Sequence, residues 1–242
     1  MNSSSGEELL EEAEIQSRLK KLKGAGIIAI LRGINPERMY ERGLALAEMG
    51  CQAIEVTLDS PQALDIVKAL RRDLDPNEVM IGVGTMLDVT MADQCAAAGA
   101  EFALSPIHPP GMVAFCHMHG ILAIPGAHSM EEVVKSNEAG ARIVKLFPSS
   151  SWEVSTLQQA PENIRQLPWI PVGGIDRKSC WSWMDSGAWC VGMGSNLCGS
   201  DLAIDPQKQP VESERGLLIW RQREGPRARG MFMELQRRRE VT

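Results

Sequence analysis

Residues 27–58 read IIAILRGINPERMYERGLALAEMGCQAIEVTL, which contains a complete strand–helix–strand unit. The apolar run at 27–31 predicts a buried strand, and the run at 53–58 predicts a second one. Between them, the segment PERMYERGLALAEMG carries apolar residues at helical spacing, which is typical of a crossover helix. The alternation of short apolar runs with such helices indicates a parallel α/β sheet.

The same alternation continues along the chain and predicts eight strands. Four of the crossover helices end in a glycine that is followed by a small residue and an even-numbered strand. Eight strand–helix units in about 175 residues favour a closed (β/α)8 TIM barrel over an open doubly wound sheet. The predicted strands are 27–31, 53–58, 80–85, 102–105, 121–125, 143–147, 169–172 and 189–193, and the glycines are Gly50, Gly99, Gly140 and Gly187.

The segments on either side of these units have a different composition. Residues 1–25 predict an N-terminal helix with Ser5 as its cap, and residues 26–198 contain the barrel. Residues 199–242 have scattered Pro and Gly and, from Val211 onward, eight Arg against five Glu. This composition predicts a solvated, partly disordered, divergent tail, and the alternative is an arginine-rich contact with an anion or a nucleic acid.

Composition excludes several classes of function. The net charge of −6 argues against a dedicated nucleic-acid-binding protein, and no apolar run has the roughly 18 residues of a membrane span. The six cysteines include no C-x-x-C pair and there is no secretory signal, so we expect a cytoplasmic protein with reduced thiols. No His–carboxylate cluster has the spacing of a metal site, and we expect neither a metal nor a cofactor.

Lys145 is the most informative residue, because it interrupts the apolar run at 143–147. Burying an ammonium group is costly unless it has a use. Burial lowers the pKa of a lysine, which yields a neutral amine that can attack a carbonyl and form a Schiff base. The alternative is a strand-edge lysine that blocks aggregation, but a closed barrel has no free edge.

Glu55 is the second anomaly, a carboxylate inside the strand predicted at 53–58. Glu55 and Lys145 both lie on even-numbered strands, which share side-chain layers in a barrel, so we expect them to meet inside it. A carboxylate beside an imine-forming amine can carry the protons of that chemistry. The alternative is a structural ion pair with Lys145 or Arg32.

Other polar residues stand where predicted strands end. Arg32 ends the first strand and can hold a carboxylate with its planar fork, or it is a solvated loop arginine. Thr57, Thr85 and Ser105 end the next strands, where they can bind a substrate oxygen or simply favour strand structure.

The loops after the seventh and eighth strands are rich in glycine. Gly173 and Gly174 follow the seventh strand, and Ser195 closes the segment GMGS after the eighth. Glycines there let backbone N–H groups approach an anion, and these loops of TIM barrels frequently hold phosphate.

Residues 24–197 resemble the aldolases of 2-keto-3-deoxy-6-phosphogluconate (KDPG) and 2-keto-3-deoxy-6-phosphogalactonate (KDPGal), a family that includes 4-hydroxy-2-oxoglutarate (KHG) aldolase activity. The segments that match, in the order of the family, are AILRG, AIEVTLDSPQ, IGVGTM, SP, IPGAHS, VKLFPSS, PVGGI and GMGS. The resemblance implies a class I aldolase on a homotrimeric (β/α)8 barrel, acting without a metal. It implies reversible cleavage of a phosphorylated keto acid to pyruvate and glyceraldehyde 3-phosphate.

The resemblance also implies roles for individual residues. Lys145 would be the Schiff-base lysine and Glu55 the general acid/base. Arg32, Thr85 and Pro106 would line the pyruvate end of the site, with Phe147 beside the lysine. Gly173, Gly174 and Ser195 would hold the phosphate.

The chain departs from the family in two places and leaves two other readings open. Asp59 follows EVTL where some members have an arginine, and the tail does not resemble the family's closing helix. One alternative is a phosphosugar isomerase or epimerase, in which Glu55 is the base and Lys145 acts only electrostatically. The other is a catalytically inactive, aldolase-like assembly protein.

Overall fold

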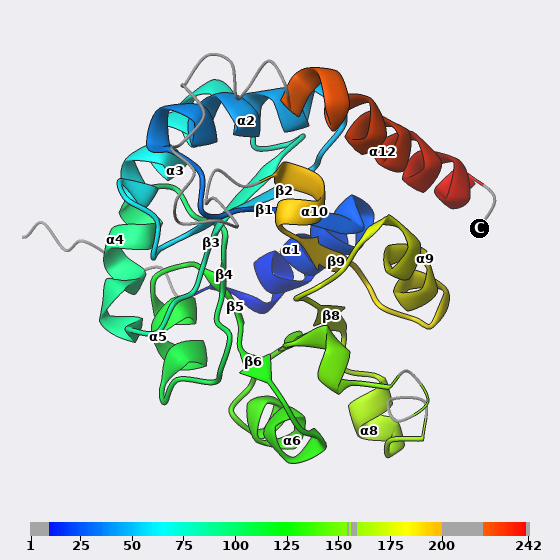
Figure 1. Ribbon diagram of the computed structural model, residues 1–242. Helices are drawn as coiled ribbons and strands as arrows, with labels where there is room; N and C mark the ends of the chain where they lie inside the picture. The colour runs from blue at the N-terminus through cyan, green and yellow to red at the C-terminus, as the bar shows by residue number, and fades with distance from the viewer. Residues whose placement is uncertain (1–9, 154, 156–158, 200–219, 241–242) are drawn as a thin grey trace, which may run out of the picture.

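The computed structural model describes residues 10–153, 155, 159–199 and 220–240, and within them the strands form a closed parallel barrel (Figure 1). One sheet has the order β5-β4-β3-β2-β1-β9 and the other the order β6-β7-β8. The sheets join at Pro125, between β5 and β6, and through a parallel bridge between Val172 and Gly192. The strands are β1 (Ile27–Leu31), β2 (Ala53–Thr57), β3 (Met80–Gly84), β4 (Phe102–Leu104), β5 (Leu122–Ile124), β6 (Gly126–Ala127), β7 (Val144–Leu146), β8 (Trp169–Pro171) and β9 (Val191–Met193).

Each of the eight runs predicted from the sequence contains a strand, so the predicted TIM-barrel fold is confirmed. The sequence did not indicate that β5 and β6 are separate strands on either side of Pro125. The four repeated glycines all have positive φ angles, between 89° and 104°, as the ends of helices before a strand require.

Helices surround the barrel and cover the outward faces of its strands (Figure 1). The crossover between β7 and β8 is the weakest predicted helical unit, and the structure describes a 3-10 turn and the four-residue α8 there. No helix in the described ranges combines the length and the apolar character needed to cross a membrane. The helices are α1 (Glu12–Ala25), α2 (Pro36–Glu48), α3 (Ala63–Asp73), α4 (Ala92–Ala97), α5 (Met112–Met118), α6 (Met130–Glu138), α8 (Glu162–Arg165), α9 (Arg177–Asp185), α10 (Ser195–Cys198) and α12 (Gly225–Glu240), with 3-10 turns η1 (Val89–Met91) and η2 (Ser149–Ser151).

The barrel interior has its own apolar core, separate from the layer between strands and helices. Inward-pointing residues alternate along each strand, as Ile28 and Ile30 do on β1. Leu19 and Leu22 of α1 belong to the same cluster, so α1 closes the amino-terminal end of the barrel. The predicted N-terminal helix therefore exists as α1, while its predicted cap, Ser5, lies outside the described residues.

The prediction of a disordered tail is wrong for residues 225–240, which form α12. Its buried apolar residues recur at helical spacing, at Ala228, Met231, Phe232 and Leu235, and α12 packs against α2. Dense arginines and the Gly225–Pro226 pair obscured this pattern, although proline is well tolerated in the first turn of a helix. The division of the chain at residues 25 and 198 stays a prediction.

The docking of α12 can be tested through stability. Phe232 is 2% exposed, whereas Met233 on the same helix is 48% exposed. Replacing Phe232 with alanine leaves a cavity, so we expect Phe232→Ala to lower the free energy of unfolding by about 3 to 5 kcal/mol. Met233→Ala, the matched control, should change it by less than about 0.5 kcal/mol. Urea denaturation measures both, and equal values for the two variants would contradict the docked position of α12.

Candidate active site

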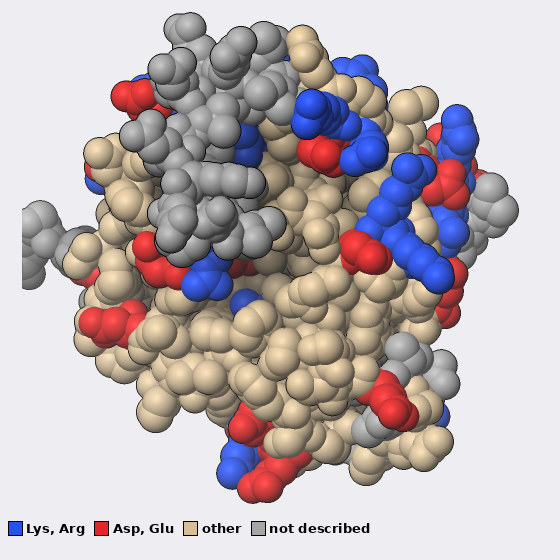
Figure 2. All heavy atoms as spheres, viewed as in Figure 1, with Lys and Arg blue, Asp and Glu red and all other residues tan. Residues whose placement is uncertain are grey.

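A cavity of about 620 Å³ lies at the carboxyl ends of the barrel strands. Figure 2 shows basic and acidic side chains side by side at a hollow near the centre of this face. All nine residues to which the resemblance assigns a role line this one cavity, together with neighbours from the same strand ends. The nine are Arg32, Glu55, Thr85, Pro106, Lys145, Phe147, Gly173, Gly174 and Ser195.

Lys145 points into the cavity from β7 and is almost fully buried, with 5% of its surface exposed. Its backbone N–H donates to Pro125 O at 2.8 Å, which holds the residue in the barrel wall. The Nζ atom lies 4.9 Å from the centre of the Phe147 ring. Burial lowers the pKa of Lys145, the Glu55 carboxylate opposes this shift, and the Arg32 cation adds to it.

Glu55 points inward from β2 and is 1% exposed. In the register of the sheet it lies beside Ile30 on β1 and Gly82 on β3. A Cβ atom at Gly84 would lie only 1.6 Å from Glu55 Oε1, so a side chain there would displace the carboxylate. Burial raises the pKa of Glu55, and the charges of Lys145 and Arg32 oppose that shift.

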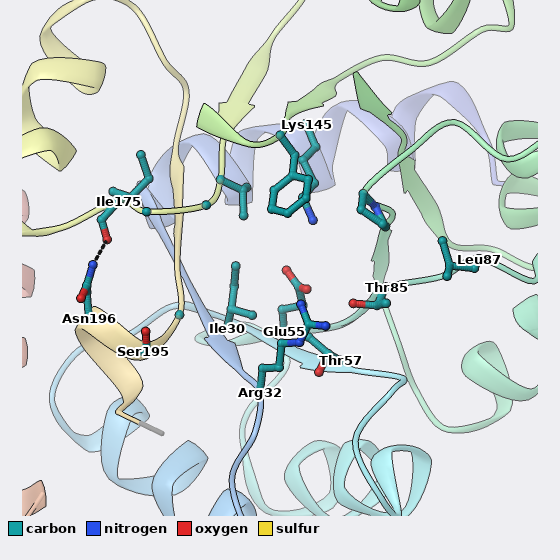
Figure 3. Close-up of a pocket in the computed structure, with 16 residues that line it drawn as sticks. Ile30, Arg32, Glu55, Thr57, Thr85, Leu87, Lys145, Ile175, Ser195 and Asn196 are labelled. Atoms are coloured by element: carbon teal, nitrogen blue, oxygen red, sulfur yellow. Dashed lines mark hydrogen bonds between the residues drawn. The ribbon is translucent and has the colours of Figure 1, made fainter. Parts of the chain in front are cut away.

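Lys145 and Glu55 face each other across the middle of the cavity (Figure 3). Among the described residues, the buried Glu55 Oε2 atom has no hydrogen-bond partner, and the two side chains form no direct ion pair. Burial drives both groups toward their neutral forms. A neutral amine opposite a carboxyl group with an unused oxygen can attack a carbonyl while protons move between the two partners.

The side of the cavity formed by β1 to β4 carries groups suited to a carboxylate or keto acid. Arg32 Nη2 donates to Asp59 Oδ2 at 2.6 Å, and both residues are partly exposed at the cavity mouth. Thr85 adopts a φ of 58°, a strained conformation for a threonine and one that is enriched at functional sites. Pro106 follows β4, and Gly126 packs so closely against it that a Cβ atom would lie 2.4 Å from the Pro106 carbonyl carbon.

The opposite side of the cavity is built from the loops after β8 and β9. Gly173 and Gly174 have φ angles of 94° and 76°, and both line the cavity. A Cβ atom at Gly173 would lie 3.0 Å from the Phe147 ring, which places this loop against the wall that carries Lys145. Figure 3 shows Ser195 at this end, apart from Thr85 at the other.

Sequence reasoning missed Asn196, and of the other two candidates at strand ends, Thr57 and Ser105, it placed only Thr57 correctly in the cavity. Asn196 lines the cavity and donates through Nδ2 to Ile175 O at 3.0 Å (Figure 3); its place beside Ser195 in GMGSN was the available signal. Thr57 also lines the cavity, with its hydroxyl 3.0 Å from Ser60 Oγ. Ser105 does not line the cavity, because its Oγ atom instead accepts from Ile107 N at 3.4 Å.

Comparison with known proteins identifies the family. The family model described as KDPG and KHG aldolase matches residues 15–213, which is most of the chain. The chain belongs to the KDPG and KHG aldolase family. The family and the lyase class predicted from the sequence motifs are thus confirmed.

Individual relatives support the same assignment. The 2-dehydro-3-deoxy-6-phosphogalactonate aldolase of Escherichia coli is 28% identical over 191 residues, covering 76% of this chain and 89% of the relative. The 2-dehydro-3-deoxy-phosphogluconate aldolase of Treponema pallidum is 35% identical over 132 residues, covering 54% of this chain and 62% of the relative. A KDPG aldolase from Legionella pneumophila, crystallised with pyruvate as a covalent carbinolamine intermediate, has a TM-score of 0.68 at 22% identity and covers 90% of this chain and 97% of its own. That likeness shows the shared fold.

The lowered pKa of Lys145 predicts an unusual acylation profile. An amine reacts with acetic anhydride only in its neutral form, so a lower pKa moves the labelling curve to lower pH. Lys135 is the control, because a hydrogen bond to Glu131 raises its pKa. We expect labelling of Lys145 to level off at a lower pH than labelling of Lys135, as measured by mass mapping. Urea should remove the difference, and coincident curves in the folded protein would contradict the pKa shift.

Proposed function

We propose that this protein is a class I aldolase that reversibly cleaves KDPG or KDPGal to pyruvate and glyceraldehyde 3-phosphate. The observation that carries the proposal is the buried Lys145 amine facing the buried Glu55 carboxyl group inside a family-matched barrel. The membership of the family and the names of its relatives support the same reaction.

The chemistry follows from these two groups. The neutral Lys145 amine attacks the keto carbon of the substrate to give a carbinolamine, and loss of water gives an iminium ion. When the C3–C4 bond breaks, its electron pair moves toward the iminium nitrogen and forms an enamine. The C4 hydroxyl loses its proton, which releases the aldehyde. Protonation of the enamine at C3 and addition of water then release pyruvate and restore the amine.

Glu55 is suited to carry the protons of this sequence. It faces Lys145, its pKa is raised by burial, and its Oε2 atom has no partner among the described residues. A carboxyl group with a raised pKa can both donate and accept a proton near neutral pH. Glu55 therefore assists the loss of water, takes the proton of the C4 hydroxyl and returns a proton to C3.

The two ends of the cavity accommodate the two anionic ends of the substrate. Arg32 presents a planar fork to the carboxylate, with Thr85 and Pro106 beside it and Phe147 against the lysine. The backbone of Gly173 and Gly174 and the Ser195 hydroxyl face the phosphate. No metal is needed, because the iminium nitrogen itself accepts the electron pair.

We also propose a homotrimer in the cytoplasm. The family resemblance supports the trimer, and exposed apolar side chains at Leu87, Ile107 and Phe115 offer surface for contacts between copies. All six cysteines are free and buried, as expected in a reducing compartment. Sedimentation equilibrium measures the oligomeric state directly.

Borohydride trapping tests the central step. Incubation with pyruvate and sodium borohydride should add the mass of one pyruvate less one oxygen atom to the peptide that contains Lys145. Lys145→Ala should abolish both the adduct and cleavage of KDPG, whereas Lys135→Ala, which removes an exposed lysine, should retain both.

The outcomes separate the proposal from its alternatives. Turnover of a phosphosugar without any trapped adduct would favour the isomerase or epimerase. Neither turnover nor an adduct in folded protein would favour the inactive assembly protein. If the adduct forms, the cleavage rates for KDPG and KDPGal show which of the two C4 epimers is the preferred substrate.

A negative charge at Ser195 tests the phosphate end separately. We expect Ser195→Asp to raise the KM for the phosphorylated substrate by more than about tenfold, equivalent to about 1.4 kcal/mol, because like charges repel. Trapping of pyruvate, which has no phosphate, should be unchanged. Ser17→Asp adds the same charge at an exposed site on α1 and should leave the KM unchanged. An unaltered KM in Ser195→Asp would contradict the assignment.

A further inference from the structure

The ion pair between Arg32 and Asp59 stands at the mouth of the cavity. Arg32 directly follows β1, and Asp59 lies two residues beyond the end of β2. Arg32 lines the cavity, whereas Asp59 does not, and Asp59 contacts the site through its hydrogen bond with the arginine. The two loops are thus joined by one short hydrogen bond of 2.6 Å.

This pair contributes little to folding. The side chains of Arg32 and Asp59 are 57% and 39% exposed, and solvent screens such pairs to about 0 to 1 kcal/mol. Its effect on geometry is greater. Arginine carries five N–H donors in a rigid plane, and among the described residues Asp59 accepts from one of the two on Nη2. The rest of the fork stays available for a second carboxylate.

An exposed arginine without such an anchor would sample many side-chain conformations. Ordering a long, flexible side chain on ligand binding costs about 0.5 to 1.5 kcal/mol. Asp59 imposes that order before the ligand arrives, because it fixes one edge of the guanidinium plane. The remaining edge then meets an incoming carboxylate in the geometry that a paired hydrogen bond requires.

We propose that Asp59 is a positioning residue, which holds the Arg32 guanidinium at the cavity mouth so that it binds the carboxylate of a 2-keto acid. This proposal rests on the proposed function, in which Arg32 binds the pyruvate carboxylate. Asp59 contributes no atom to the reaction and acts on affinity for the carboxylate end of the substrate.

Pyruvate trapping at varied concentration tests the role of Asp59. Asp59→Ala should raise the pyruvate concentration that gives half-maximal trapping by about two- to tenfold, the equivalent of ordering one long side chain. The maximal extent of trapping should stay within about twofold of the wild type. Asp59→Asn, which keeps an oxygen acceptor for Nη2, should give an intermediate value. KM for the phosphorylated substrate should rise in parallel while kcat changes little.

Three controls separate positioning from a general structural effect. Glu12→Ala breaks the Arg142–Glu12 pair, which has the same 2.6 Å length but does not line the cavity, and should leave half-maximal trapping unchanged. In the Arg32→Ala background, Asp59→Ala should have no further effect, because the residue it positions is gone. Trapping of acetone, which lacks a carboxylate, should not depend on Asp59.

The possible results are distinguishable. An unchanged or lowered half-maximal pyruvate concentration in Asp59→Ala, with trapping on Lys145 intact, would overturn the positioning role. So would an equal effect of Asp59→Ala with and without Arg32. Absence of any adduct on Lys145 in the wild-type protein would instead overturn the proposed function itself.

Discussion

The burial of a lysine and a glutamate in one barrel interior is the constraint on which the rest of the structure depends. Neither charge is favourable in an apolar interior, and the cost is reduced because each group faces the other. The barrel provides this arrangement only when it is closed, since an open sheet would leave one strand and its side chain at a solvated edge. Small residues complete the arrangement, because Gly84 leaves the space that the Glu55 carboxylate occupies.

The two terminal helices support this closed barrel at the end opposite the site. Leu22 of α1 is fully buried in the interior core, and Leu235 of α12 packs over Gly26, just before β1. A Cβ atom at Gly26 would lie 2.8 Å from Leu235, so β1, the strand that leads to Arg32, begins against α12. The tail is therefore part of the packing that fixes β1, even though it lies far from the chemistry.

Much of the site could be predicted because its residues contradict their local sequence. A lysine inside an apolar run and a glutamate inside a strand are each anomalies, and the period-two alternation of strands places both inside the barrel. Pro106 and Phe147 show no such anomaly, and they were indicated only by resemblance to a family. Their presence in the cavity agrees with that resemblance.

The features that the sequence did not predict depend on contacts between distant segments. The apolar stripe of α12 has helical spacing, but its arginines resemble those of a solvated tail until the partner surface on α2 is known. The contact of Asp59 with Arg32 joins residues 27 positions apart in the chain, and no local pattern specifies it. Local periodicity thus predicts elements and their inward faces, whereas loop-to-loop pairs require the three-dimensional structure.

The position of Arg32 helps to explain how an acidic protein can accommodate an anionic substrate. The whole chain has a net charge of −6, which opposes the approach of an anion at long range. Salt screens exposed charges beyond about 10 Å, so groups at the site decide the interaction at contact. Among the described residues that line the cavity, Arg32 is a cation and Glu55 is the one carboxylate, whose raised pKa favours its neutral form. Arg32 therefore stabilises a bound carboxylate at contact, although the protein as a whole repels an anion at long range.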